Sequence, residues 1–272
     1  MSNNQKVNEL YAVLKSGVDS LYDSQAWKEF LKVQSLFHKY SWRNTILIYL
    51  QCPHATRILG FKEWKKVKRF VQRGEKAIKI WAPSIKIEKD EETEEEVPKV
   101  NGYYPVSVFD ISQTGGEELP TLTPELKMET EELKSFYETL KSICEFPIEE
   151  TTLSKGIKGS YSPVTDQIKI KKGMASLHKC KTLIHEMSHA YLHKNSSKTR
   201  GMEEVEAEGT AYVVLSYFGF DTSQYSFGYV AGWNGSKESK DIESAASTIQ
   251  KTACQIIEMI EKERNQSAKQ VA

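Results

Sequence analysis

The chain has 272 residues, and its 37 basic and 37 acidic side chains cancel to a formal net charge of zero. With 39% hydrophobic and 27% charged residues it has the composition of a globular protein, which excludes the fibrous and disordered classes. The longest apolar stretch is too short to span a bilayer, the first residues lack the apolar core of a secretory signal, and the four cysteines lie far apart. We therefore expect a cytoplasmic protein with reduced thiols and without a membrane partner.

The charge is unevenly distributed along the chain. Residues 27–84 carry 13 Lys or Arg and three acidic residues, a net charge of +10, and the run of residues 88–96 that follows is strongly acidic. Such an asymmetry is typical of a surface that faces a polyanion beside a solvated loop. A nucleic-acid partner is therefore expected for the first part of the chain, although the overall charge does not suggest one.

The hydrophobic pattern of the first part predicts several helices followed by a β-hairpin. Apolar residues recur with helical spacing up to the stop at Cys52-Pro53, and Ser41 is placed as the N-cap of the third helix. Two alternating segments flank the acidic run and the Asn101-Gly102 turn, which predicts a hairpin with a long tip. The expected elements are helices at residues 7–22, 24–38, 42–51 and 61–71, and strands at residues 77–87 and 103–111.

A glycine pair followed by two prolines within residues 115–124 marks the expected linker, so we predict two domains, residues 1–118 and residues 119–272. Helical patterns dominate the second domain, with a strand pair near its start. The fold class is therefore predicted as α+β, with N-terminal helices and a long β-hairpin in the first domain. The elements expected in the second domain are helices at residues 125–144, 174–193, 203–218 and 237–262, and a strand pair at residues 159–170.

The sequence His185-Glu186-Met187-Ser188-His189 predicts a metal site on the helix at residues 174–193. Residues four apart share a helix face, so both imidazoles can reach one ion. Glu186 lies about 100° round the helix from His185, beside the ion without binding it. This spacing is typical of catalytic zinc sites, which use three protein ligands and leave one position open. The competing interpretation is a pair of surface histidines on an ordinary amphipathic helix.

A third protein ligand has to come from another part of the chain. His193 lies one turn beyond His189 on the same face, but it is about 12 Å from His185 along the axis, so three ligands in line on one helix cannot converge on one ion. We therefore interpret His193 as a helix-end residue. The helix at residues 203–218 offers four glutamates on two faces, and spacing alone does not choose among them: Glu203, Glu204, Glu206 and Glu208.

This HExxH sequence, followed by a helix that contains Glu-Ala-Glu-Gly-Thr-Ala-Tyr from residue 206, resembles the ImmA/IrrE-type zinc metallopeptidases. The resemblance implies a gluzincin-like second domain whose third ligand is a glutamate on the following helix, Glu206 by position, with Glu208 as the second choice. It implies a Zn²⁺ ion, for which Mn²⁺, Co²⁺ or Ni²⁺ can substitute, and hydrolysis of a peptide bond by water that Glu186 deprotonates. Tyr225 and Tyr229 are candidate oxyanion donors, with packing as their alternative role.

The first part of the chain has a resemblance of its own. Its motifs are Tyr-Ser-Trp-Arg-Asn, Cys-Pro-His-Ala-Thr, Gly-Phe-Lys-Glu-Trp-Lys-Lys, Arg-Gly-Glu-Lys-Ala-Ile and Val-Phe-Asp-Ile-Ser-Gln-Thr, starting at residues 40, 52, 60, 73 and 108. This order is similar to the N-terminal single-stranded-DNA-binding domain of the ArdC antirestriction proteins, which pair that domain with a zinc peptidase-like domain. The resemblance covers nearly the whole chain and implies protection of incoming single-stranded DNA from host restriction.

Aromatic residues interleaved with cations suit a single strand, because bases stack on rings while Lys and Arg follow the phosphates. Each Trp can equally be a core residue, and a run of lysines can be a solvated helix face. Phe61 and Trp81 are further possible stacking platforms. The residues expected to contact DNA are Trp42, Arg43, Arg57, Trp64, Lys65, Lys66, Lys68, Arg69, Arg73 and Lys76.

Three functions remain open at the level of sequence. The first is a DNA-protecting protein with an active endopeptidase, whose protein substrate the sequence does not identify. The second is a DNA-binding module whose metal site serves folding alone. The third is a regulatory protease of the ImmA/IrrE type that cleaves a DNA-bound repressor.

Overall fold

The computed structural model describes residues 3–89, 96–119, 130–220 and 239–271. The chain forms two compact units, the first from Met1–Ser20 and Trp42–Pro120 and the second from Leu21–Ser41 and Thr121–Ala272. It therefore passes from one unit to the other three times. The last crossing lies close to the predicted boundary at residues 118 and 119, whereas residues 21–41, which the sequence placed in the first domain, belong to the second unit.

Two expectations concern residues outside the described ranges. They are most of the acidic run at residues 88–96 and the candidate oxyanion donors Tyr225 and Tyr229. Among the helices that the structure describes, none combines the length and the hydropathy that a bilayer span requires.

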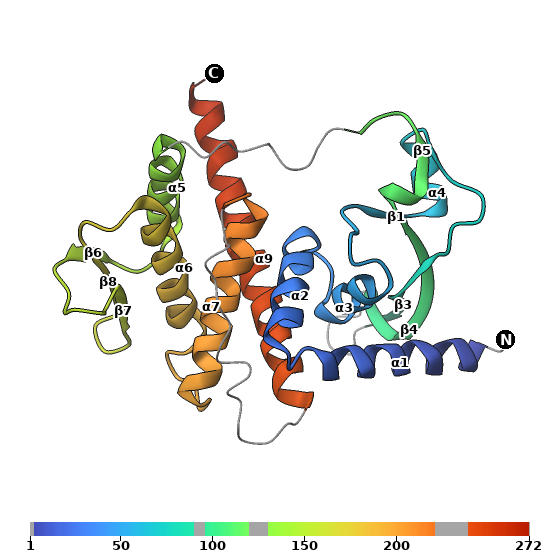
Figure 1. Cartoon of the computed structure of the whole chain (residues 1–272), viewed down its shortest axis with the longest axis horizontal. Helices are drawn as coiled ribbons and strands as arrows, with labels where there is room; N and C mark the ends of the chain where they lie inside the picture. The colour runs from blue at the N-terminus through green and yellow to red at the C-terminus, as the bar shows by residue number, and fades with distance from the viewer. Residues whose placement is uncertain (1–2, 90–95, 120–129, 221–238, 272) are drawn as a thin grey trace. The chain divides into compact units, whose positions relative to one another are not determined.

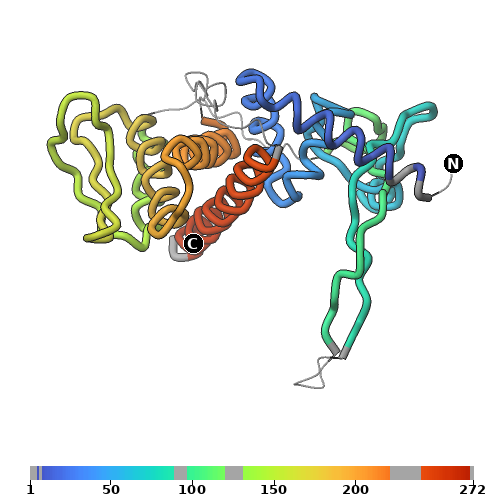
Figure 2. Tube along the Cα trace, turned by 90° about the horizontal axis from the view of Figure 1, so that it is seen from below, coloured from blue at the N-terminus to red at the C-terminus, as the bar shows by residue number. Residues whose placement is uncertain are grey.

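The first unit packs helices against a three-stranded antiparallel sheet (Figure 1). Its elements are α1 Asn3–Ser20, α3 Trp42–Gln51, β1 Ile58–Gly60, α4 Phe61–Lys66, β2 Arg69–Val71, β3 Ile78–Lys89, β4 Glu96–Asp110, the 3₁₀ turn η1 Ile111–Gln113 and β5 Thr114–Gly116. Strand β4 lies between β1 and β3, and β3 and β4 form the predicted hairpin, which extends well beyond the rest of the unit (Figure 2). Ile46, Ile48, Trp64, Ile78 and Ile80 are buried in its core.

Helix α3 has the predicted bounds and is fastened to β3 by two side-chain amides. Asn44 donates to the Trp81 carbonyl (2.9 Å) and accepts from the Trp81 N–H (2.8 Å), and Gln51 makes the same pair of bonds with Lys79 (2.9 Å each). These bonds satisfy backbone groups at the edge of the sheet. The two amides therefore serve the fold of this unit.

The helix predicted at residues 61–71 ends at Lys66, because the backbone turns through a left-handed conformation at Lys68 (φ 57°). Strand β2 follows and pairs antiparallel with β5. Gly116 is required opposite this turn: its φ is 126°, and a Cβ there would lie 2.4 Å from the Lys68 carbonyl oxygen. Sequence periodicity missed this strand because β2 has three residues only.

The described part of the second unit is built on helices and a small sheet. Its elements are α2 Ser24–Leu36, α5 Thr130–Ile143, β6 Ile148–Thr151, β7 Gly159–Ser162, β8 Gln167–Lys171, α6 Ser176–Leu192, α7 Arg200–Tyr217 and α9 Ser239–Val271. Helix α7 packs against α2, α6 and α9 (Figure 1). Small residues permit this close approach: Ala207 and Ala211 are fully buried, and a Cβ at Gly209 would lie 2.4 Å from Ile249 Cδ1. The helix that carries the glutamates is thus held on several sides.

The small sheet lies beside α6, with β8 between β6 and β7. The predicted strand pair is present as β7 and β8, which are antiparallel, and β6 adds a parallel neighbour that the sequence did not indicate. The sequence of β6, Ile-Glu-Glu-Thr, is too short and too polar for an alternating pattern. The predicted α+β class is confirmed.

Candidate metal centre and nucleic-acid interface

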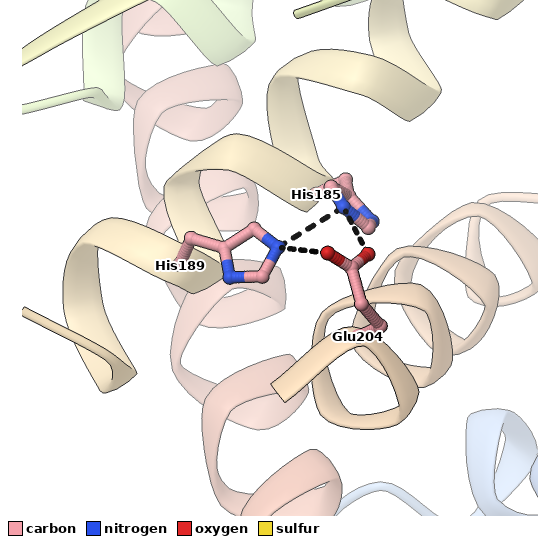
Figure 3. A group of neighbouring side chains, drawn as sticks. All are labelled: His185, His189 and Glu204. Atoms are coloured by element: carbon pink, nitrogen blue, oxygen red, sulfur yellow. Dashed lines mark hydrogen bonds and ion pairs between the residues drawn. The ribbon is translucent and has the colours of Figure 1, made fainter. Parts of the chain in front are cut away.

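Helices α6 and α7 bring the two HExxH histidines to a glutamate (Figure 3). His185 Nε2 lies 3.1 Å from His189 Nε2 and 3.4 Å from Glu204 Oε2, and His189 Nε2 lies 3.9 Å from Glu204 Oε1. One potential ligand atom from each of the three residues lies within 4.8 Å of the others. Two imidazole nitrogens and one carboxylate oxygen form a donor set that suits a divalent transition metal.

Glu206 does not join this cluster. Its side chain is fully buried on another face of α7, where its carboxylate lies 3.0 Å from His193 Nε2 and 2.5 Å from Lys198 Nζ. Residues 204 and 206 are about 200° apart round a helix, so the two carboxylates cannot share one face. The structure therefore places Glu204, one of the four glutamates left open by spacing, in the position that the resemblance assigned to Glu206.

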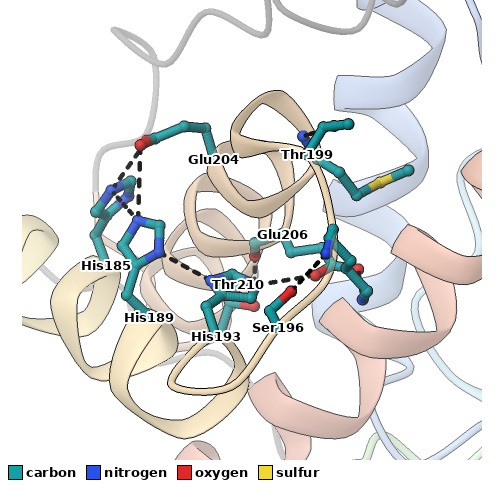
Figure 4. A network of polar contacts seen from close by, with 10 residues as sticks. His185, His189, His193, Ser196, Thr199, Glu204, Glu206 and Thr210 are labelled. Atoms are coloured by element: carbon teal, nitrogen blue, oxygen red, sulfur yellow. Dashed lines mark hydrogen bonds and ion pairs between the residues drawn. The ribbon is translucent and has the colours of Figure 1, made fainter. Parts of the chain in front are cut away.

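His193 takes part in the same network, although the sequence suggested a helix end alone. It is the C-cap residue of α6, and its Nδ1 lies 2.8 Å from His189 Nδ1 (Figure 4). The i+4 spacing predicts that His193 lies close to His189, but it does not predict a contact between the two Nδ1 atoms.

Glu208, the second choice from the sequence, contacts His185 at the ring nitrogen that faces away from the cluster. Its carboxylate lies 3.3 Å from His185 Nδ1 and 2.5 Å from Lys181 Nζ. Both histidines therefore have a polar partner at the nitrogen that faces away from the cluster, a pattern typical of metal-binding histidines.

Glu186 lies beside the cluster in a cleft of about 730 Å³, which is lined by α6, α7 and the β7 strand. Its side chain is buried and accepts a hydrogen bond from the Tyr161 backbone N–H. Gly159 leaves room for it, because a Cβ there would lie 3.0 Å from Glu186 Oε1 and 2.5 Å from Thr182 Cγ2. Glu186 thus lines the same cleft as His185, His189 and Glu204.

The electrostatics of the cluster favour a cation. Burial opposes protonation of His185, but contacts with Glu204 and Glu208 outweigh it and raise the pKa of the imidazole to about 9. Burial, and then the charge on His185, lowers the pKa of His189 to about 4. Burial also raises the pKa of Glu186. The carboxylates around His185 thus favour a positive charge at the position that a divalent ion would occupy.

Three of the four aromatic residues expected to stack on bases are buried. Trp64 is fully buried and its indole N–H donates to the Phe109 carbonyl (3.0 Å), and Trp42 and Trp81 are 7% and 8% exposed. Their rings belong to the core of the first unit, so the structure does not place them where a base can stack. Phe61, the fourth of them, is 50% exposed, and Phe70 and Tyr11 are exposed as well, at 59% and 56%.

The cations expected to contact phosphate divide into two groups. Arg69 is a structural residue: its guanidinium donates to the Thr114 hydroxyl (2.9 Å), the Thr114 carbonyl (3.0 Å) and the Glu117 carbonyl. Arg57 is half-buried, and its backbone N–H donates to Asp110 Oδ1 (2.9 Å). Six of the expected cations are exposed, among them Lys66 and Lys68, which form ion pairs with exposed glutamates. The exposed set is Arg43, Lys65, Lys66, Lys68, Arg73 and Lys76.

Residues 4–109 of the chain match the family model of the N-terminal domain of anti-restriction factor ArdC. The chain is ArdC-like. This match covers α1, α3, the predicted hairpin and the exposed cations.

Two crystal structures of the antirestriction ArdC protein from plasmid R388 have the same fold as this ArdC-like chain. The metal-free structure matches with a TM-score of 0.53 and 22% identity, over 81% of this chain and 85% of that one. The Mn(II)-bound structure matches with a TM-score of 0.58 and 20% identity, over 92% of this chain and 97% of that one.

A protein of Bacillus anthracis, pXO2-81, is 29% identical to the ArdC-like chain over 306 residues. The match covers 95% of this chain and 52% of that protein, so the chain spans about half the length of this relative.

Proposed function

We propose that this ArdC-like chain binds single-stranded DNA through its first unit and hydrolyses peptide bonds in the cleft of its second unit, as an antirestriction protein in the cytoplasm of the cell that receives the DNA. The observation that carries the enzymatic part is the placement of Glu186 beside the triad of His185, His189 and Glu204, in an open cleft. A purely structural metal site is closed by a fourth protein ligand and needs no neighbouring base.

The second unit is proposed to be gluzincin-like, with Glu204 on the following helix as the third ligand. The bound ion, zinc by preference with Mn²⁺, Co²⁺ or Ni²⁺ as substitutes, would supply Lewis acidity toward water and a carbonyl group. His185, His189 and Glu204 hold the ion. Glu186, whose pKa burial raises, takes the proton from the attacking water and passes it to the leaving amine.

The edge strand β7 supports a peptide as substrate. It lines the cleft and pairs with β8 on one side, while no other described strand pairs with its second side. A strand edge of this kind binds an extended peptide by backbone hydrogen bonds. The cleft therefore offers a binding mode that depends little on the side chains of the substrate.

The first unit supports a nucleic acid as partner. Exposed lysines and arginines can follow phosphates, and the exposed rings of Phe61 and Phe70 are open to bases. Lys65 Nζ lies 5.2 Å from the Phe61 ring centre, which places a cation and a stacking surface together. Contacts of this type read little base identity, so the proposal predicts weak sequence preference.

Hydrolysis is tested with the full chain loaded with Zn²⁺ or Mn²⁺ and a mixture of fluorescence-quenched peptides whose products are identified by mass spectrometry. The wild type is expected to cleave a subset of the peptides. Glu186→Gln is expected to bind the ion with unchanged stoichiometry and to lose cleavage. Equal cleavage by the variant and the wild type would overturn the role of Glu186, and absence of cleavage by both would favour a structural metal.

Antirestriction is tested by transformation of restriction-proficient and restriction-deficient cells that carry the wild type or Glu186→Gln. We expect the wild type to raise the yield of unmodified DNA in the proficient host alone. A phenotype that survives in Glu186→Gln would assign protection to DNA binding. A phenotype that is lost together with the clearance of a repressor would assign the regulatory-protease function instead.

A further inference from the structure

A chain of buried polar contacts runs from His189 away from the metal cluster (Figure 4). His189 Nδ1 lies 2.8 Å from His193 Nδ1, His193 Nε2 lies 3.0 Å from Glu206 Oε2, and Glu206 Oε1 lies 2.5 Å from Lys198 Nζ. The His193 side chain is 4% exposed and the Glu206 side chain is fully buried. Buried polar groups at such distances are held in one arrangement because each loses a partner if it turns away.

The hydrogen-bonding roles along this chain follow from its far end. The Lys198 ammonium has donors only, so the Glu206 carboxylate beside it is an acceptor. His193 Nε2 is therefore the donor to Glu206. A cation held by the His189 Nε2 lone pair leaves the ring proton of His189 on Nδ1, and that proton is donated to His193 Nδ1. His189 Nε2 is the atom that faces His185 and Glu204.

The other histidine reaches the same state by a shorter path. Lys181 makes the Glu208 carboxylate an acceptor, and Glu208 lies 3.3 Å from His185 Nδ1. With an ion bound at Nε2, the ring proton of His185 stays on Nδ1, where the Glu208 carboxylate accepts it. Glu208 acts on His185 directly and Glu206 acts on His189 through His193, so both ligand candidates present Nε2 to the cation.

The geometry points to His193 and Glu206 as a positioning pair that holds His189 with its proton on Nδ1 and its Nε2 free for a divalent cation. The inference rests on the proposed metal site, but it concerns residues that do not touch the ion. Groups that orient a ligating histidine in this way typically contribute about 10- to 100-fold to metal affinity.

A direct ligand role for Glu206 is the rival interpretation. It would require the carboxylate to leave both His193 Nε2 and Lys198 Nζ and to move round α7 to the face of Glu204. The positioning role uses Glu206 where the structure has it.

The test measures the affinity of the full chain for Zn²⁺ by competition with a chromophoric chelator. His193→Phe removes both ring nitrogens and is expected to weaken binding about 10- to 100-fold at unchanged 1:1 stoichiometry. His193→Asn keeps an amide oxygen near the position of Nδ1, so it is expected to recover most of the loss. The matched control is His178→Phe, the same change on the same helix, which is expected to leave the affinity unchanged.

A spectroscopic measurement needs no variant and covers the case in which His193→Phe does not fold. In long-range ¹H–¹⁵N spectra of the Zn²⁺-loaded wild type with labelled histidine, His189 is expected to coordinate through Nε2 and to carry a slowly exchanging proton on Nδ1. Where His193→Phe folds, the same proton is expected to exchange faster in the variant, which a merely structural contact would not cause.

The outcomes separate the inference from the proposed function. If the wild type binds Zn²⁺ and Glu204→Gln does not, while His193→Phe binds as tightly as the wild type, the positioning pair is wrong and the site stands. Coordination of His189 through Nδ1 would also overturn the pair. Loss of the ion in Glu206→Gln to the same extent as in Glu204→Gln would assign Glu206 as a ligand. If the wild type binds no divalent ion, the proposed site and the pair fail together.

Discussion

The metal cluster of the second unit and the cationic surface of the first unit are held by the fold in different ways. Glu204, His185 and their partners are half-buried to buried, and each of them contacts two or more charged or ring groups. Lys65, Arg73 and Lys76 are exposed side chains on the surface of the first unit. A site of the first kind loses its affinity for the ion when one residue is replaced, whereas a surface of the second kind loses a small part of its affinity for DNA with each residue that is replaced.

The strongest test of this difference is Glu204→Gln. The change removes one charged ligand from a set of three, so we expect the affinity for Zn²⁺ to fall by at least about 100-fold, on the scale of the loss of a buried charged partner. Isothermal titration calorimetry measures the affinity. The rise in melting temperature that saturating Zn²⁺ gives the wild type should disappear as well.

Glu203→Gln is the control for this prediction, because it makes the same chemical change one residue earlier on α7 and outside the triad. It is expected to retain wild-type affinity. A variant of Glu204 that binds the ion normally would show that the observed cluster is not the metal site.

The next effect concerns the DNA surface, where several cations must be changed together. We expect their replacement by Gln to lower the affinity for a 30-residue oligothymidine about 10- to 100-fold at 50 mM salt. The slope of log K against log salt should become shallower by about 3, since each single-strand phosphate contact contributes about 0.7. Fluorescence anisotropy measures both quantities. The four residues are Lys65, Lys66, Arg73 and Lys76.

The matched control replaces four exposed lysines of the second unit by Gln and is expected to leave the slope unchanged. An equal loss in both variants would mean that overall charge, and not this surface, governs binding. The control residues are Lys134, Lys172, Lys251 and Lys262.

A smaller effect is expected from Gly159→Ala, which acts on Glu186 without touching the ligands. The added methyl group would collide with Thr182 and Glu186, so the carboxylate must shift within the cleft. We expect peptide cleavage to fall about tenfold with unchanged Zn²⁺ affinity, because small displacements of a reacting group are costly. Gly156→Ala is the control, because Gly156 lines the same cleft but no atom lies near its added methyl group. Melting temperatures of the two variants separate the effect of backbone strain from that of crowding. Equal cleavage by wild type and Gly159→Ala would contradict this packing.

The smallest effect concerns His38, a buried histidine of the second unit that lies outside the metal cluster, with its ring 4.6 Å from that of Tyr217. Burial and then Lys39 lower its pKa below the usual 6.5. The unfolded chain therefore binds a proton at His38 more strongly than the folded chain does. The free energy of unfolding falls as the pH drops below about 6.5. His38→Phe should remove that part of the slope, which cannot exceed about 1.4 kcal/mol per pH unit. Urea unfolding at pH 7, 6 and 5 measures it, and parallel curves for both proteins would contradict the assignment.

Local sequence patterns were sufficient to predict where α6, which carries the two histidines, and α7, which follows it, lie along the chain. The i, i+4 histidines, the adjacent Glu186 and the α3 bounds follow from spacing within one helix. The choice between Glu204 and Glu206 could not be made that way. It depends on how α7 is rotated against α6, and each residue turns the helix by about 100°.

The aromatic residues show a second limit of sequence reasoning. Trp64 and Phe61 lie in the same short helix, yet the first is fully buried and the second is 50% exposed. Nothing in a run of lysines and aromatics states which ring faces the core, because the core is formed by strands that come later in the chain. The charge of the region was a better guide than any single ring.

The membership of α2 in the second unit has a consequence for how this protein is made and divided. Gln34 of α2 donates to the Ala246 carbonyl of α9 (3.2 Å), and Trp27 and Phe30 are fully buried. During synthesis α2 leaves the ribosome long before α7 and α9, so the helices that bury its apolar side are still missing while the first unit is being synthesised. A gene cut at the linker yields a C-terminal fragment without α2. This chain order allows two ways to keep residues 21–41 with the later helices. One is a circular permutant and the other is a co-expressed pair of fragments.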